Sequence, residues 1–221
     1  MSMPNSRMRK RIPAQSRGEM RVSLILDACA RLLVRNSSSN FTMHGLAEEA
    51  KTSIGSLYHF FADKQAVIDA LVIRHVEGGA RILEKLTSVP DRKWIEWPPR
   101  TVMLELHSLN IIYVQENPDV RILWNEARFN TKHGSVVSLD LLALYERVLS
   151  LRMPEASRTA ISKYAQGLYR LPMGFLLWDV PGNDQNSWGL FSEEAPRALT
   201  AYLEAVEKEY AQSRAACPIP A

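Results

Sequence analysis

The sequence has few cysteines and no long hydrophobic run, and these two shortages exclude several classes of protein. Only Cys29 and Cys217 are present among 221 residues, which is too few for a disulfide framework or a cysteine zinc site. No uncharged apolar run approaches the ~20 residues that a membrane helix requires. The apolar segment after the basic N-terminus is interrupted by Asp27 and Arg31, so it makes a poor secretory signal. We therefore expect a cytoplasmic protein that does not enter a membrane.

Signals for catalysis and for metal binding are also absent. No two of the five histidines stand four residues apart, and no cluster of cysteine and histidine occurs, so we expect no zinc site. The sequence contains no glycine-rich phosphate loop, no serine nucleophile elbow and no pair of catalytic carboxylates. We accordingly expect no cofactor and no enzymatic activity.

Apolar residues recur at helical spacing along most of the chain, and no segment shows the alternation typical of strands. The pattern predicts an all-α protein of about nine helices. One of these helices begins at Asn117 and Pro118 and is broken at residues 132–134. The helix that follows it ends before Pro154. The other expected helices cover 17–35, 43–50, 54–60, 64 to before Pro90, a segment ending near Glu116, 155–179 and 193–213, with 88–99 irregular.

Charge is unevenly distributed between the two ends of the chain. Residues 1–65 contain ten Lys/Arg and five Asp/Glu, a net charge of +5, whereas residues 66–221 carry −2. A basic front on a nearly neutral body predicts a polyanionic partner for the front alone. Residues 1–15 form a basic arm that we expect to be disordered. This arm is either a solvated tail or a contact to DNA phosphates or the minor groove.

The segment from Phe41 to Leu71 has the spacing of a helix-turn-helix. Thr42 can cap a helix over 43–50, because its hydroxyl can accept from the unpaired N–H groups of the first turn. Residues 51–53 then form the turn, and Ser53 can cap a second helix over 54–60. Asp63 is placed to cap the following helix, which opens with Lys64. In a helix-turn-helix the second helix enters the DNA major groove.

The residues of this segment resemble the DNA-binding signature of the tetracycline-repressor-like (TetR) regulators. The agreement is in register across Phe41-Thr42, Leu46-Ala47, Ala50 and Ser53-x-Gly55-x-Leu57-Tyr58-x-x-Phe61-x-x-Lys64, and it covers roughly residues 20–71. One departure is Lys51, because the family usually has glycine there. Glycine suits a left-handed residue at a helix end, so Lys51 costs up to ~1 kcal/mol or the turn differs slightly.

The resemblance implies which residues contact DNA. Phosphate contacts are expected from the residues at the helix starts and at the end of the second helix, and base contacts from the turn and Ser56. The expected DNA-binding residues are Thr42, Lys51, Thr52, Ser53, Gly55, Ser56, Tyr58, His59 and Lys64. The alternative is that Tyr58 and His59 are ordinary surface residues. The second helix has no Arg, Asn or Gln for a bidentate base contact, so specificity is expected to use small polar residues and DNA shape.

Four parts of the chain are expected to have different roles. After the arm of residues 1–15, residues 16–63 form the DNA-binding domain, and Ser16 to Glu19 have the form of a capping box. Residues 64–213 form a helical domain for effector binding and dimerisation, and 214–221 a disordered tail. The long helix that opens at Lys64 carries Gly78 and Gly79, where we expect it to yield.

Aromatic and methionine side chains are frequent in the helical domain. They line a pocket for an apolar or aromatic effector, or they fill an ordinary helical core, which is the commoner role for such residues. A histidine at position 107 could orient a ligand, although a lone histidine is more often a satisfied core residue. The candidate ligand-binding residues are Trp97, Met103, His107, Tyr113, Trp124, Phe129, Tyr145, Tyr169 and Met173.

The resemblance further implies a one-component regulator, usually a repressor. It would bind a near-palindromic operator as a homodimer, because one short recognition helix reads too few base pairs alone. The last two long helices are expected to form a four-helix interface with their copies, through Ile161, Leu168, Phe175, Leu199, Leu203 and Val206. Two alternatives remain: a regulator controlled by a protein partner, and an all-α enzyme or ligand-binding protein that carries a helix-turn-helix.

Overall fold

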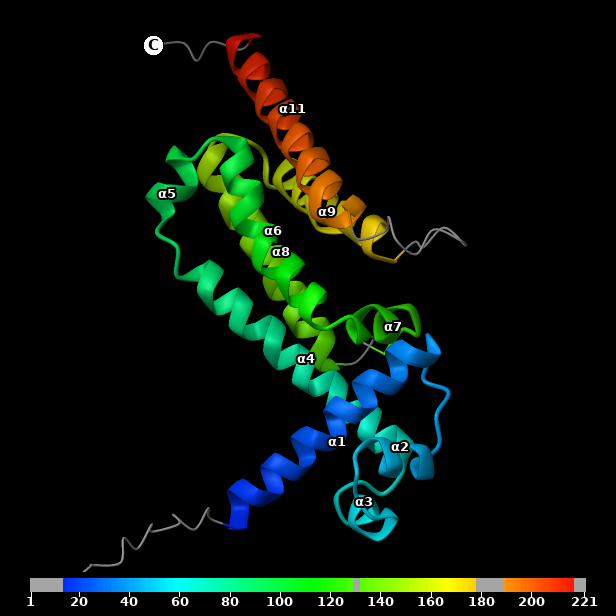
Figure 1. Ribbon diagram of the computed structural model, residues 1–221. Coiled ribbons are helices and arrows are strands. Elements are labelled where there is room, and N and C mark those ends of the chain that lie inside the picture. The colour runs from blue at the N-terminus through cyan, green and yellow to red at the C-terminus, as the bar shows by residue number, and fades with distance from the viewer. Residues whose placement is uncertain (1–13, 129–131, 178–188, 217–221) are drawn as a thin grey trace, which may run out of the picture. The chain divides into compact units, whose positions relative to one another are not determined.

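The computed structural model describes residues 14–128, 132–177 and 189–216, and every regular element in these ranges is helical (Figure 1). The prediction of an all-α fold is therefore confirmed. The chain divides into two compact units, residues 1–71 and 72–221. The sequence placed a boundary at Lys64, whereas the units divide two helical turns later, after Leu71. Val67, Ile68 and Leu71 are fully buried, which explains why these two turns belong to the first unit.

The first unit contains three helices and the start of a fourth. They are α1 (Ala14–Asn36), α2 (Met43–Glu49), α3 (Ile54–Phe60) and the first turns of α4 (Lys64–Thr87). Helix α2 packs against both α1 and α3. The buried side chains of α1 to α3 are Ile25, Leu26, Ala28, Cys29, Leu32, Leu33, Leu46, Ala47 and Leu57. Met20 and Leu24 of α1 are about half exposed.

The starts of the helices agree with the sequence in most cases. Thr42 accepts a hydrogen bond from the backbone N–H of Gly45 at 3.1 Å, and Asp63 accepts one from that of Ala66 at 2.8 Å. The capping box expected at Ser16 is wrong, because α1 begins at Ala14 and already includes that residue. Residues 1–13 of the expected arm lie outside the described residues, as do residues 217–221 of the tail.

The second unit contains the rest of α4 and the remaining helices. These are α5 (Asp91–Glu96), α6 (Pro99–Glu116), α7 (Asp119–Asn125), α8 (Lys132–Arg152), α9 (Arg158–Leu177), a short π-helical turn (Leu190–Glu194) and α11 (Ala195–Ala216). Helix α8 packs on α5 and α9, and α11 packs on α6 and α9. Helices α9 and α11 lie side by side in Figure 1. The largest fully buried side chains of this unit are Trp94, Tyr145, Leu86, Met103, Leu106 and Leu123.

Three local predictions for the second unit are wrong. The segment expected to be irregular contains α5, whose Trp94 is completely buried. The break expected at 132–134 lies earlier, because Ala127 has a left-handed φ of 56° and α8 begins at Lys132. The last helix, expected over 193–213, begins at Ala195, after the π-helical turn Leu190–Glu194. Helix α4 continues through Gly78 and Gly79 to Thr87.

Candidate nucleic-acid interface

Helices α2 and α3 are joined by a turn whose hydrogen bonds are those of a Schellman motif. The backbone N–H of Lys51 donates to the carbonyl of Glu48, and that of Thr52 donates to the carbonyl of Ala47, both at 3.0 Å. This pattern satisfies the last carbonyls of a helix and requires a left-handed residue just past its end. Lys51 is that residue, with φ of 51°. The turn therefore has the conformation that favours glycine, although this chain has lysine there.

Helix α3 starts where the sequence predicted, and Ser53 fixes its first turn. The Ser53 hydroxyl accepts a hydrogen bond from the backbone N–H of Ser56 at 3.1 Å. Leu57 is completely buried and anchors the helix on the first unit. The opposite face is open: Tyr58 is 51% exposed, His59 is exposed, and nothing lies within 4 Å of a Cβ added at Gly55. A nucleic acid could approach this face without displacing protein.

Lys64 is placed differently from a simple phosphate-binding lysine. Its ammonium Nζ lies 3.3 Å from the carbonyl oxygen of Ser39 and 5.6 Å from the centre of the Phe41 ring. The side chain is half-buried by these contacts. Lys64 therefore fixes the loop before α2 to the start of α4, and any phosphate would have to share an ammonium that already has two protein partners.

Two arginines that the sequence analysis did not single out hold α1 against α2. Arg31 Nε lies 2.8 Å from one carboxylate oxygen of Glu49, and Arg35 Nη1 lies 3.0 Å from the other. The hydrogen bond from Arg31, together with that from Arg35, lowers the pKa of Glu49 below its usual value. Arg31 and Arg35 stand four residues apart and so share one face of α1, which was the available sequence signal.

The candidate effector residues of the second unit belong mainly to its core. Met103, His107 and Tyr145 are buried, whereas Trp97, Tyr113, Trp124 and Tyr169 are partly buried. Phe129 lies outside the described residues, and the side chain of Met173 is not described. The seven candidates whose side chains are described are thus all buried or partly buried.

A buried polar pair stands within this apolar core. The Tyr145 hydroxyl lies 3.1 Å from His107 Nε2, and both side chains are buried. Burial lowers the pKa of His107 to about 4 and raises that of Tyr145. The imidazole is therefore neutral at pH 7, and the hydrogen bond satisfies two polar groups that would otherwise be costly to bury.

A second polar cluster, formed by His75, Tyr113 and Asp119, joins α4 to α6 and α7. His75 Nε2 lies 2.7 Å from Asp119 Oδ2, and His75 Nδ1 lies 2.8 Å from the Tyr113 hydroxyl. A carboxylate only accepts, so Nε2 carries the proton, and in the neutral ring Nδ1 accepts the phenolic O–H. Burial and the charge of Asp119 raise the pKa of Tyr113. Sequence reasoning placed only Tyr113 at a site, because residues 44 positions apart show no pairing signal.

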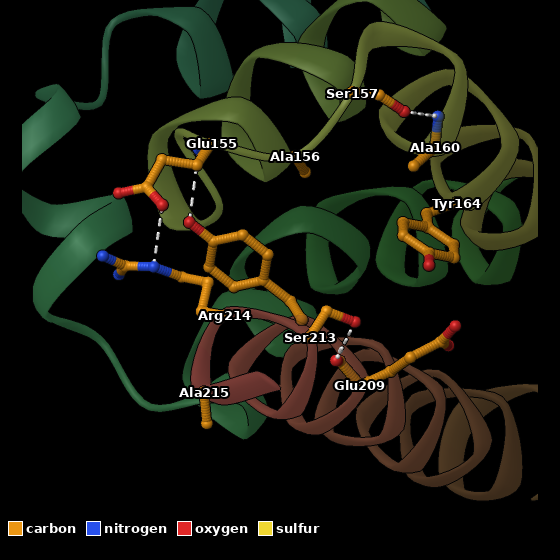
Figure 2. Close-up of a pocket in the computed structure, with 10 residues that line it drawn as sticks. Glu155, Ala156, Ser157, Ala160, Tyr164, Glu209, Ser213, Arg214 and Ala215 are labelled. Atoms are coloured by element: carbon orange, nitrogen blue, oxygen red, sulfur yellow. Dashed lines mark hydrogen bonds and ion pairs between the residues drawn. The ribbon is translucent and has the colours of Figure 1, made fainter. Parts of the chain in front are cut away.

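The grooves that the described residues of the second unit form include three that no candidate effector residue lines. Figure 2 shows the groove between the start of α9 and the end of α11, with a volume of about 720 Å³. Arg214 Nε lies 2.8 Å from Glu155 Oε2, and the backbone N–H of Glu155 donates to the Tyr210 hydroxyl at 3.2 Å. These contacts tie the two helix ends together and occupy much of the groove's polar lining.

Most of the residues expected at a dimer interface lie in the core of the second unit instead of on its surface. Ile161, Leu168, Leu199, Leu203 and Val206 are all buried in the core of the second unit within a single chain. Phe175 lies in α9, and its side chain is not described. The apolar stripes of α9 and α11 therefore mark the core of this chain, and a partner could reach only the other faces of these helices.

Within the described ranges, no group of three or more His, Cys, Asp or Glu side chains could hold a metal ion. In the same ranges, no helix has the length and hydrophobicity needed to cross a membrane. Cys29 is buried and forms no disulfide, whereas Cys217 falls beyond the last described residue.

Comparison with known proteins identifies the first unit. Residues 25–71 match the family model described as "Bacterial regulatory proteins, tetR family". A crystal structure of a TetR-family transcriptional regulator from Streptomyces coelicolor is 27% identical, with 84% of this chain and 99% of that chain covered and a TM-score of 0.48. Mycobacterium smegmatis AmtR is 20% identical, with 96% and 99% covered and a TM-score of 0.45. No curated protein matches the chain.

Proposed function

We propose that this chain is a DNA-binding transcriptional regulator of the TetR family, because residues 25–71 match that family's model, and that it is a repressor that a small molecule releases from a palindromic operator. The observation that supports this most directly is the open face of α3. Its first turn is fixed by Ser53, its inner side by Leu57, and its outer side presents Tyr58 and His59 to solvent. A rigid, exposed second helix is what major-groove recognition needs.

We propose that Thr42, Ser53, Tyr58, His59 and Lys64 contact phosphates. The hydroxyls of Thr42 and Ser53 already accept a backbone hydrogen bond, and each can still donate its own proton to a phosphate oxygen. Ser56 and Thr52 lie nearest the start of α3, where base edges are read. Gly55 leaves room for the backbone to approach DNA. Lys51 adds a positive charge at the turn.

The test of DNA contact compares two matched losses of a hydroxyl. Tyr58→Phe should weaken binding to a DNA duplex from upstream of the chain's own gene, in a fluorescence anisotropy titration. Tyr164→Phe removes the same atom from α9 in the second unit and should leave the affinity unchanged. Equal affinities of wild type and Tyr58→Phe would remove Tyr58 from the interface, and equal losses in both variants would point to a general effect on folding.

Dimerisation follows from the length of the recognition helix. A helix of seven residues reads few base pairs, and two-fold proteins meet two half-sites about 34–36 Å apart. Because the apolar stripes of α9 and α11 are used in the chain's own core, we place the interface on their outward faces. A groove of about 940 Å³ runs along α9 there, lined by residues that include Gln166, Arg170 and Leu171.

Leu171, which is 41% exposed on α9, gives the sharpest test of this interface. Leu171→Glu should shift the mass measured by light scattering from dimer to monomer, because it would place an unpaired charge at two symmetric positions. Ile95→Glu, at a more exposed position on α5 (53%), should stay dimeric. A dimeric Leu171→Glu protein would move the interface away from α9.

The effector is expected within the second unit, where the buried pair of His107 and Tyr145 could exchange its hydrogen bond for one to a ligand. Reducing operator affinity a hundredfold requires a coupling free energy of about 2.7 kcal/mol between the two ligands. Small molecules that raise the melting temperature of the protein and also release DNA would support this control. If no compound tested shifts the melting temperature, control by a protein partner becomes the better account.

A further inference from the structure

We propose that Arg21 is an additional phosphate-binding residue and that Thr52 holds its guanidinium beside the start of α3. The inference rests on the DNA-binding function stated above and adds a residue of α1 to it. Arg21 Nη1 lies 3.5 Å from Thr52 Oγ1, a long hydrogen bond that joins α1 to the residue just before the cap of α3. The contact positions the guanidinium without burying it, because Arg21 remains exposed.

The early turns of α1 lie beside both ends of α3. At one end Arg21 contacts Thr52, and at the other a Cβ added at Gly18 would lie 4.0 Å from Phe60 Cε1. These two observations place the early turns of α1 close to α3. When α3 enters a major groove, neighbouring elements meet the sugar-phosphate backbone at the groove's edge. A side chain of α1 that ends beside Thr52 is therefore placed at that edge.

The charges along α1 are divided between two functions. Arg31 and Arg35, near its end, are paired with Glu49. Among the described residues, no carboxylate pairs with Arg21, which is exposed. A guanidinium that no carboxylate neutralises, held at a defined place by a hydroxyl, can offer a planar pair of N–H donors to a phosphate.

Arg21 also supplies a positive charge that α3 itself lacks. The sequence of α3, Ile54–Phe60, contains no lysine or arginine, and Lys64 at the start of α4 is already engaged by Ser39 and Phe41. Arg21 supplies a guanidinium in contact with Thr52, the residue just before the cap of α3. Thr52, expected from the sequence to read bases, then acts instead as a positioning residue for Arg21.

The experiment measures DNA affinity over a salt series for the full chain, using a duplex selected from random sequence and a shuffled duplex of the same composition. Arg21→Ala should weaken binding to both duplexes by a similar factor. It should also reduce the slope of log K against log salt by about 0.9 per protomer, the value for one lost phosphate contact. Arg21→Lys should retain most of the slope, because the charge remains.

Arg35→Ala is the matched control, because it removes the same charge from the far end of the same helix. It should leave the salt slope unchanged. Thr52→Val should weaken binding, Thr52→Ser should not, and Arg21→Ala with Thr52→Val should bind no more weakly than Arg21→Ala alone. That pattern would show that Thr52 acts through Arg21.

Three results would overturn the proposal. The first is a wild-type salt slope in Arg21→Ala, and the second is an equal reduction in Arg35→Ala. The third is a loss of preference at one base pair with an unchanged slope, which would make Arg21 a base-reading residue. Failure of the DNA-binding function itself would look different, because wild type would then bind neither duplex.

Discussion

Lys51 shows how a single residue can depart from the ideal for its place and still be tolerated. Its φ of 51° lies in the left-handed region, which is unfavourable for a residue with a Cβ. Both hydrogen bonds of the turn are nevertheless formed. Ser37 and Ala127 adopt the same conformation, with φ of 51° and 56°, after α1 and α7. The chain thus ends three helices with Schellman motifs and uses glycine in none of them.

The first prediction concerns this position. Lys51→Gly should raise the free energy of unfolding by up to about 1 kcal/mol, because glycine adopts positive φ without a steric cost. Chemical denaturation of both proteins measures the difference. Lys51→Ala, which keeps the Cβ and removes the charge, is the control and should give little gain. An equal gain in both variants would attribute the effect to charge, not to backbone conformation.

The second prediction concerns Gly78, which packs closely against Tyr113. A Cβ at Gly78 would lie 2.2 Å from the Tyr113 hydroxyl and 2.5 Å from Cζ, so alanine would displace the ring and break its hydrogen bond to His75. Gly78→Ala should destabilise the protein by roughly 1–3 kcal/mol despite the better helix propensity of alanine. The structure thus gives Gly78 a packing role, and bending of α4 at Gly78 and Gly79 stays a prediction.

Gly174 in α9 provides the comparison, because nothing lies within 4 Å of a Cβ added there. Gly174→Ala should leave stability unchanged or raise it by up to about 1 kcal/mol. Thermal melts of the two variants separate the packing effect from helix propensity. A Gly78→Ala protein that gains as much as Gly174→Ala would contradict the close packing of Tyr113.

At the scale of whole elements, α5 is the helix that the sequence did not predict. Arg152 of α8 explains its stability, since Nη1 donates to the carbonyls of Trp94 and Trp97 at 2.6 and 2.8 Å and Nε pairs with Glu207. The last carbonyls of a helix need such partners. A six-residue helix held by a tertiary contact leaves no periodic signal, so the prolines around it suggested irregular structure.

The third prediction compares two arginines of α8 that both contact the region of α5. The Arg152 side chain is 9% exposed, whereas that of Arg147, which pairs with Asp91, is 39% exposed. Arg152→Ala should cost about 2–4 kcal/mol, because it leaves buried carbonyls unsatisfied. Arg147→Ala should cost no more than about 1 kcal/mol. Denaturation midpoints measure both, and equal costs would show that burial does not distinguish the two contacts.

The helices themselves were predicted well where local chemistry decides them. Ser53 and Thr42 cap their helices as expected, and α3 covers exactly the predicted residues because its cap and its apolar positions lie within seven residues. The sequence could not predict which surface each helix packs against when that surface is distant along the chain. The stripes of α9 and α11 indicate burial, but a stripe has the same pattern whether it faces its own core or a partner. Leu199 and Leu203 face the core.

At the scale of the whole molecule, stability should depend on pH through His107. Its pKa is about 4 in the folded protein and about 6.5 in the unfolded chain. Between these values the unfolded state binds the additional proton, so stability is present above pH 6.5 and is lost as pH falls towards 4. The loss should approach about 3 kcal/mol at pH 4.

Denaturation at several pH values between 4 and 7 measures this fourth prediction. His107→Gln cannot titrate and can still bond to Tyr145, so its stability should fall less steeply over the same interval. The difference between the two curves isolates His107 from the acidic residues, which both proteins share. Parallel curves would contradict a neutral, buried His107.

The central claim is that this chain recognises a specific, two-fold symmetric DNA sequence through the open face of α3. The most direct measurement is selection of binding sites from a pool of random-sequence duplexes with the purified full chain. The account predicts enrichment of an inverted repeat whose half-site centres are about 34–36 Å apart, and loss of that enrichment with Ser56→Trp on α3. A pool that stays random, or a selected site that Ser56→Trp binds equally well, would contradict the claim.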